Sequence, residues 1–136
     1  MTGKSPRKRV EVLYWQGRLR VAQAYLAAAR QAVLLAEPPQ AGNPIISQIV
    51  LAAIAYGDCL TAKRAQVINQ QDHAQAPRLL RDVLQNTLPE AQEKRYRRIL
   101  GFKDDVQYGT KTASLEEAAR LLGDLESFAL WAEELL

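Results

Sequence analysis

One stretch, residues 43–67, constrains the fold of this chain more than any other. It reads NPIISQIVLAAIAYGDCLTAKRAQV and is apolar on almost every helical face from Ile45 to Leu60. A helix that is apolar all round has to be covered on all sides, so it is the centre of a bundle or a membrane span. Its uninterrupted apolar part, Ile49 to Gly57, is far shorter than the roughly 20 residues that a bilayer requires. We therefore expect the central helix of a soluble bundle.

Amphipathic patterns predict helices around this centre. The first runs from Val10 to about Ala36, and its apolar positions recur at helical spacing: Val10, Leu13, Tyr14, Gly17, Val21, Ala24, Tyr25, Ala28, Ala32 and Leu35. Two prolines at 38 and 39 end it. Asn43 is the expected N-cap of the central helix, with Pro44 at its first position, and this helix should run to about Ile68.

The later helices are marked by capping residues. Asp72 should cap a short third helix, and Thr87 with Pro89 should start a fourth that ends near Lys103. Residues 104–113 are expected to form a polar loop or a frayed helix end. Ser114, followed three residues later by Glu117, is a capping box that opens the last helix.

Composition places these helices in one all-α domain. The chain has 136 residues, of which 48% are hydrophobic and 24% charged, and its common residues are good helix formers. Short connections favour an up-down antiparallel bundle of four main helices plus one short helix, over residues 10–136. The wide apolar faces of the first and last helices favour a homodimer.

The formal net charge of +3 is concentrated at the start of the chain. Four basic residues precede the first acid, and residues 1–9 are expected to be a disordered basic arm: Lys4, Arg7, Lys8 and Arg9. This arm suits contact with nucleic acid or an anionic surface, and equally a role as a solubilising leader.

Several chemistries are disfavoured by the residue inventory. Cys59 and His73 are the only residues of their kinds, so one chain cannot build a Cys/His metal site, and we expect no metal and no cofactor. The seven glycines are scattered and form no phosphate loop. The single cysteine and the absence of a secretory pattern favour a cytoplasmic protein.

Basic and aromatic residues near the fourth helix are the candidate binding residues. Arg95 and Arg98 belong to a basic outer face that suits a phosphate backbone, although such faces are often merely solvated. Lys103, Gln107 and Tyr108 follow at a helix end, where lysine would meet phosphate and tyrosine would stack on a base. The alternative is that Lys103 stabilises the helix C-terminus and Tyr108 is half-buried.

Two polar residues are expected to be buried. Asp58 lies in the most apolar stretch, where an unpaired carboxylate is costly, so we expect an ion pair with Lys103 or Lys63. His73 is interpreted as a capping or packing residue at the start of the third helix rather than as a catalyst.

Four stretches resemble the HEPN superfamily, the nucleotide-binding domain of higher eukaryotes and prokaryotes. They are AAIAYGDCLTAKRA (52–65), DHAQAPRLL (72–80), KDDVQYGTKTASLEEA (103–118) and LLGDLESFALWAEELL (121–136). The resemblance covers about residues 20–136 and rests on pattern rather than on an invariant signature. It implies a helical bundle that often forms dimers.

The same resemblance argues against the family's ribonuclease chemistry. Many members cleave RNA with an arginine and a histidine that have four to six residues between them. Upstream of His73 the corresponding positions hold Ile68, Val67 and Gln66, and residues 103–108 contain no histidine. The resemblance therefore implies a non-catalytic module that binds a nucleotide, RNA or a partner nucleotidyltransferase, in a toxin–antitoxin or defence system. The alternatives are a helical protein–protein interaction module with no nucleotide role and a ribonuclease that uses atypical residues.

Overall fold

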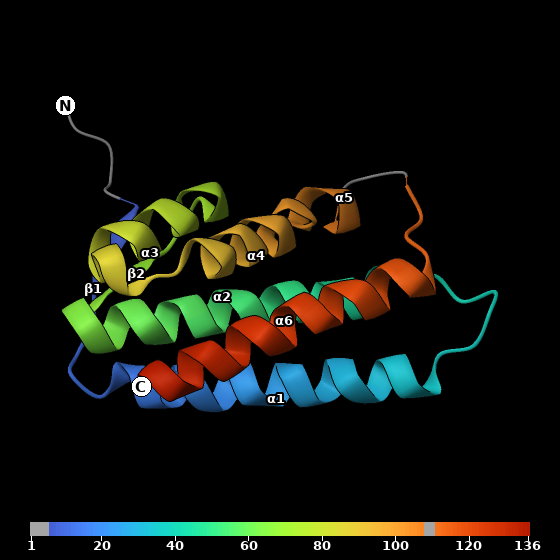
Figure 1. Ribbon diagram of the computed structural model, residues 1–136, viewed down its shortest axis with the longest axis horizontal. Coiled ribbons are helices and arrows are strands. Elements are labelled where there is room, and N and C mark those ends of the chain that lie inside the picture. The colour runs from blue at the N-terminus through green and yellow to red at the C-terminus, as the bar shows by residue number, and fades with distance from the viewer. Residues whose placement is uncertain (1–5, 108–110) are drawn as a thin grey trace.

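The protein is predominantly helical, as its sequence predicts. The computed structural model describes residues 6–107 and 111–136 (Figure 1). Its elements follow in the order β1 (Arg7–Arg9), α1 (Tyr14–Leu35), α2 (Asn43–Ala65), β2 (Val67–Asn69), the 3-10 turn η1 (His73–Gln75), α3 (Ala76–Leu84), the 3-10 turn η2 (Gln85–Thr87), α4 (Glu90–Gly101), α5 (Lys103–Gln107) and α6 (Leu115–Leu135). The all-α class is thus confirmed, apart from one small two-stranded sheet that was not predicted.

The long helices alternate in direction and surround α2. Helices α1 and α2 run antiparallel, and α6 runs antiparallel to α4 while lying across α1 and α2 (Figure 1). Helices α3 and α4 lie on the other side of α2, which contacts all of the other helices. This central position explains why the sequence of α2 is apolar on every face.

The core is built on α2. Ile46, Ile49 and Tyr56 of α2 are fully buried. Within the described part of the chain, α2 is also the one helix that is long and apolar enough to cross a membrane. Of its most apolar window, 78% is buried inside the protein. Gly57 allows α4 to approach closely, because an added Cβ would lie 2.2 Å from the Tyr96 hydroxyl.

The buried face of α1 differs from the predicted one. Its fully or nearly buried residues are Ala22, Leu26 and Ala29, whereas Leu13 and Leu35 of the predicted stripe are 61% and 78% exposed. Helix α1 carries alanine and leucine on more than one face, so periodicity alone does not identify the face that meets α2. Of the predicted stripe, Val21, Tyr25 and Ala32 are partly buried against the core, whereas Leu13, Ala24 and Leu35 are exposed.

Residues 7–9 of the predicted disordered arm form strand β1, contrary to the prediction. Strand β1 pairs antiparallel with β2, so Arg7 lies opposite Asn69 and Arg9 opposite Val67. Helix α2 accordingly ends at Ala65 rather than near residue 68, and Gln66 adopts a left-handed conformation with φ of 53°. The strand partner is distant in sequence, which is why local periodicity extends the helix too far. Residues 1–5 lie outside the described residues.

The capping predictions have mixed outcomes. Ser114 and Glu117 form the predicted capping box, and the Asp72 side chain accepts a hydrogen bond from the Ala74 amide. Asn43, however, is already helical, with Gly42 as the N-cap. The Asn43 side chain instead holds the segment before α6: Ala113 N–H donates to Asn43 Oδ1 over 2.8 Å.

The fourth helix also differs from the predicted one at both ends. Thr87 does not cap it; the Thr87 hydroxyl donates to the Leu84 carbonyl, and Pro89 is the N-cap residue. Helix α4 ends at Gly101 and is followed by the short α5, where a loop or frayed end was expected.

Candidate functional site

A cleft opens where η1 and the start of α3 face the end of α4 and α5. It holds two adjoining cavities of about 270 and 290 Å³, which share His73 and Lys103. The lining of the first cavity combines charged and apolar residues, which besides these two are Asp72, Ala74, Pro77, Arg97, Leu100, Gly101 and Asp104. The second is mainly apolar and is also lined by Ser47, Val50, Leu51, Ile54 and Val106. We call the two together the His73 cleft.

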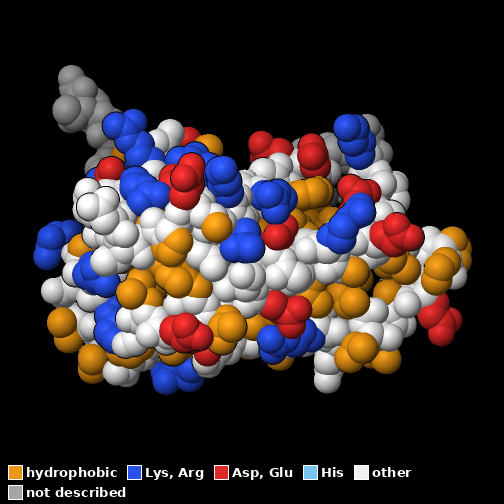
Figure 2. Space-filling model, in the orientation of Figure 1, with side chains coloured by type: hydrophobic (Ala, Val, Ile, Leu, Met, Phe, Trp, Pro, Cys, Tyr) orange, Lys and Arg blue, Asp and Glu red, His pale blue; other side chains and the backbone are white. Residues whose placement is uncertain are grey.

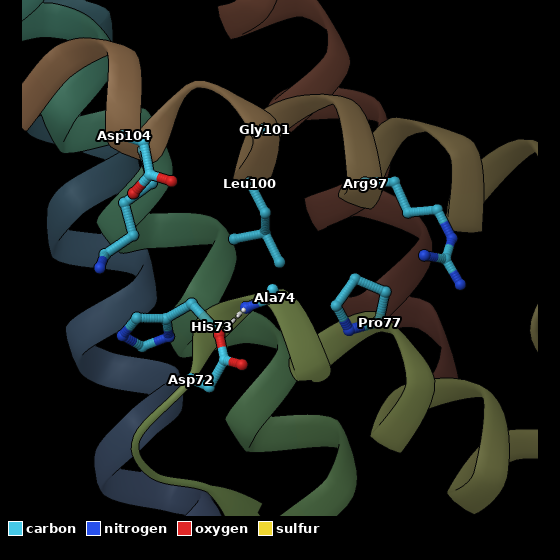
Figure 3. Close-up of a pocket in the computed structure, with 9 residues that line it drawn as sticks. Asp72, His73, Ala74, Pro77, Arg97, Leu100, Gly101 and Asp104 are labelled. Carbon is cyan, nitrogen blue, oxygen red and sulfur yellow. Dashed lines mark hydrogen bonds between the residues drawn. The ribbon is translucent and has the colours of Figure 1, made fainter. Parts of the chain in front are cut away.

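Local structure places these residues. Figure 3 shows Asp72 and His73, the cap and first residue of the 3-10 turn, on one side of the first cavity and Leu100 and Asp104, from α4 and α5, on the other. The Asp72 carboxylate accepts from the Ala74 amide over 3.0 Å, which fixes the turn that presents His73. Pro77, in the first turn of α3, completes that side.

The environment of His73 favours its neutral form. Burial lowers the pKa of its imidazole, the nearby Lys103 ammonium lowers it further, and Asp72 opposes both effects. Its Nδ1 atom is shielded from solvent and makes no hydrogen bond in the structure. Among the described residues no carboxylate accepts a hydrogen bond from this ring, so the attraction of Asp72 offsets only part of the cost of charging it.

The two basic residues of the first cavity differ in whether a neighbouring acid pairs with them. Arg97 makes a hydrogen bond of 3.1 Å to Glu93 one turn earlier on α4, and its side chain is about half-exposed. Lys103 makes no ion pair within 4.0 Å among the residues that the structure describes. The charge of the Lys103 ammonium is therefore less neutralised by ion pairing than the charge of the Arg97 guanidinium.

The basic face of α4 is largely neutralised by neighbouring acids. Arg98 binds Asp124 of α6 at 2.9 Å, and Arg95 approaches the same carboxylate at 3.9 Å. Figure 2 shows acidic and basic side chains interleaved over the upper half of the molecule, where α3 and α4 lie. Neither arginine lines the His73 cleft. Their ion pairs join α4 to α6, which the sequence could not indicate.

Three other predicted binding residues follow α4 in the sequence. Lys103 lines both cavities, and Gln107 is the last residue of α5. Tyr108 lies outside the described residues. Of the residues predicted to form a polar pocket, Lys103 lines the cleft. Arg97 and the apolar wall also line it and were not part of that predicted pocket.

Asp58 pairs with a residue that was not predicted. Its carboxylate lies 3.4 Å from Arg18 of α1, rather than near Lys63 or Lys103. Lys63 instead donates to the C-terminal Leu136 and lies 4.6 Å from the centre of the Trp15 ring. Burial raises the pKa of Asp58 to about 7, and the attraction of Arg18 only partly opposes this rise. The pair lies outside the cleft and joins α1 to α2.

The apolar wall of the cleft was missed at the sequence level. Leu51 is 43% exposed although it belongs to the central helix. A helix that is apolar on every face gives no sign of which residues remain uncovered, so only the packing reveals this wall. Among the described residues, no group of three or more His, Cys, Asp and Glu side chains could hold a metal ion.

The chain matches no known protein family, and no curated protein is detectably similar to it.

Proposed function

We propose that the protein is a non-catalytic, HEPN-like binding module that holds a nucleotide in the His73 cleft. The supporting observation is the pair of adjoining cavities, joined at His73 and Lys103: one is lined by Arg97 as well as by the carboxylates of Asp72 and Asp104, and the other has an apolar wall. A nucleotide requires both environments, because its phosphate is anionic and its base has an apolar face. Lys103 and Arg97 would bind the phosphate, and Leu51, Ile54 and Val106 would contact the base.

The dimensions of the cleft are compatible with one mononucleotide. Ligand pockets commonly have volumes of about 300–1,000 Å³, and each cavity falls just below this range. Together they accommodate a base and a phosphate in separate compartments. A long RNA strand fits less well, because Arg95 and Arg98 are already paired with Asp124.

A binding role suits the chemistry of the cleft better than catalysis. A general base needs a partner that orients it and accepts the charge that develops, as in the Ser-His-Asp arrangement. His73 has no such hydrogen bond in the described structure, and the arginine that the family's ribonucleases place upstream of the histidine is missing. The proposal therefore treats His73 as part of the wall. A cytoplasmic location and a nucleotidyltransferase partner belong to the same proposal.

Calorimetric titration of the purified protein with AMP, ATP and a short RNA tests this function. We expect saturable binding of a mononucleotide that weakens as the salt concentration rises, because part of the affinity comes from phosphate contacts. Lys103→Ala should raise the Kd at least tenfold, since a charge-assisted hydrogen bond contributes about 1.5–3 kcal/mol. Lys94→Ala is the matched control, because Lys94 is an exposed lysine of α4 that lines neither cavity.

Two results would contradict the proposal. One is the absence of heat and of any rise in Tm with every ligand, at ligand concentrations up to the millimolar range. The other is equal loss of affinity in Lys103→Ala and Lys94→Ala, which would indicate nonspecific attraction. Cleavage of the RNA that is lost in Lys103→Ala would favour the atypical ribonuclease instead.

A protein–protein interaction module is the second candidate, favoured by one specific observation. Four leucines are at least 60% exposed: Leu13, Leu34, Leu35 and Leu130. Three of them lie at the two ends of α1.

A further inference from the structure

Exposed apolar residues lie at the point where β1 leads into α1. Val12 and Leu13 form the turn between these two elements, and they are 63% and 61% exposed. Tyr14 and Trp15 follow directly and are half-buried. We call residues 12–15 the apolar tip. Single exposed apolar residues are common on protein surfaces, but two adjacent large ones followed by two aromatic residues indicate a contact surface.

The apolar tip is held against the C-terminal end of α2. The Val10 amide donates to the Gln66 carbonyl over 3.0 Å, and Gln66 Nε2 donates back to the Val10 carbonyl over 3.5 Å. The Lys63 ammonium lies 4.6 Å from the centre of the Trp15 ring. The tip therefore has a fixed position next to both β1 and the last turn of α2.

Basic side chains without an acidic partner lie beside the tip. Lys8 and Arg9 are exposed on β1, and Arg64 is exposed in the last turn of α2. None of the three has a carboxylate within 4.0 Å among the described residues, and Glu11 is the only acid in residues 1–36. Figure 2 shows Lys and Arg side chains along the left end of the molecule, where β1, the end of α2 and the start of α1 lie in Figure 1, and hydrophobic side chains at its lower corner.

This combination of residues matches the interface of an anionic bilayer. Aliphatic side chains enter the boundary between headgroups and acyl chains, and tryptophan and tyrosine are favoured at the level of the headgroups. Lysine and arginine are attracted to the negative surface of the cytoplasmic leaflet. A nucleic acid would match the cations, but its phosphate backbone offers no apolar environment for Val12 and Leu13. A protein interface would cover the apolar tip, but charged residues are usually depleted at the centre of such interfaces.

We propose that the apolar tip and the basic residues beside it bind the surface of an anionic membrane. Val12 and Leu13 enter the lipid interface, while Lys8, Arg9 and Arg64 remain at the level of the lipid phosphates. The attachment is peripheral and reversible, because it uses two aliphatic side chains and three cations, and α2 stays buried in the bundle. The inference does not depend on nucleotide binding, since these residues line neither cavity of the His73 cleft.

Co-sedimentation of the purified protein with lipid vesicles tests the proposal. We expect binding to phosphatidylcholine vesicles that contain about 30% phosphatidylserine, weaker binding as the salt concentration rises, and little binding to phosphatidylcholine alone. Val12→Ser combined with Leu13→Ser should lower the partition coefficient by roughly tenfold or more, because two aliphatic side chains no longer enter the lipid. Leu34→Ser combined with Leu35→Ser is the matched control, because these leucines are 82% and 78% exposed at the other end of α1.

A second pair of variants tests the charges. Lys8→Ala combined with Arg64→Ala should weaken binding to the anionic vesicles by roughly tenfold or more, since each cation near the surface contributes to the attraction. Lys111→Ala combined with Arg120→Ala is the matched control, because it removes an exposed lysine and an exposed arginine near the start of α6, at the opposite end of the molecule (Figure 1). All of these positions are exposed, and circular dichroism equal to that of the wild type would verify folding.

Several results would overturn the proposal. They are the absence of binding to either kind of vesicle, equal binding to both kinds, and a test pair that binds the anionic vesicles as tightly as its matched control. Binding of a short RNA that Lys8→Ala with Arg64→Ala weakens, while the vesicles remain unbound, would assign the basic residues to a nucleic acid and would also overturn it.

Discussion

Asp58 should make the folded protein less stable as the pH rises from about 4 to about 7. Its pKa in the folded state is about 7, compared with 3.8 for an ordinary aspartate, and burial is the main cause. Between these two values the folded state holds a proton that the unfolded state has released. Stability is then highest below the unfolded pKa and is lost as the pH approaches the folded pKa.

The structure shows why Arg18 does not prevent this loss. The side chain of Asp58 is only 13% exposed, and its contact with Arg18 is long, at 3.4 Å. The Arg18 Nε atom makes no hydrogen bond within the described structure. A single loose contact cannot replace the hydration of a buried carboxylate. The pKa difference of about three pH units corresponds to about 4 kcal/mol, as an upper estimate.

Urea unfolding of the wild type and of Asp58→Asn, measured at pH 5 and pH 8, tests this reasoning. The variant removes the ionisation but keeps the shape, so its free energy of unfolding relative to the wild type should rise by about 2–3 kcal/mol between the two pH values. The lowered pKa values of His73 and Glu93 act in both proteins and cancel. A relative stability that is the same at both pH values would refute the assigned burial cost.

Arg18→Met provides the complementary test. Without the guanidinium, the pKa of Asp58 should rise further, so the fall in stability toward pH 8 should be larger than in the wild type. An unchanged pH dependence would mean that Arg18 does not interact with Asp58 in solution.

Two further predictions concern packing. Gly57→Ala should lower the free energy of unfolding by about 2–3 kcal/mol, because its Cβ would collide with the hydroxyl of Tyr96. Gly123→Ala should raise it by about 0.5–1 kcal/mol, because its Cβ would meet open space beside α6. Similar effects of the two substitutions in urea unfolding would contradict this distinction. Arg81→Met should cost about 2–3 kcal/mol in the same assay, since Arg81 binds Glu93 and also donates to two backbone carbonyls; a cost below about 0.5 kcal/mol would show that this network is not stabilising.

Local sequence patterns predicted the helices well because their causes are local. Ser114 and Glu117 are three residues apart and form the expected capping box. The apolar run of α2 needs cover on all sides, and the bundle provides it. The strand pairing of residues 7–9 with 67–69 was missed, since neither segment signals its partner. The inner face of α1 was misassigned because alanine suits both the interior and the surface.

The candidate site required contacts that sequence spacing does not encode. Asp58 signalled a buried charge, but choosing Arg18 over Lys63 depends on the register between α1 and α2. Lys103 was predicted as a binding residue, yet its place beside His73 follows from the path of the chain between α2 and α3. The exposure of Leu51 likewise depends on how the other helices pack against α2.

The most direct test of nucleotide binding is proton NMR of His73 during titration with AMP. This residue is the single histidine of the chain, so its imidazole signals are assigned without ambiguity. The proposal predicts a saturable shift of these signals and a rise in the pKa of His73, because a phosphate beside Lys103 would offset the charge that now lowers it. Signals and pKa that remain unchanged at saturating AMP would contradict a nucleotide site in the His73 cleft.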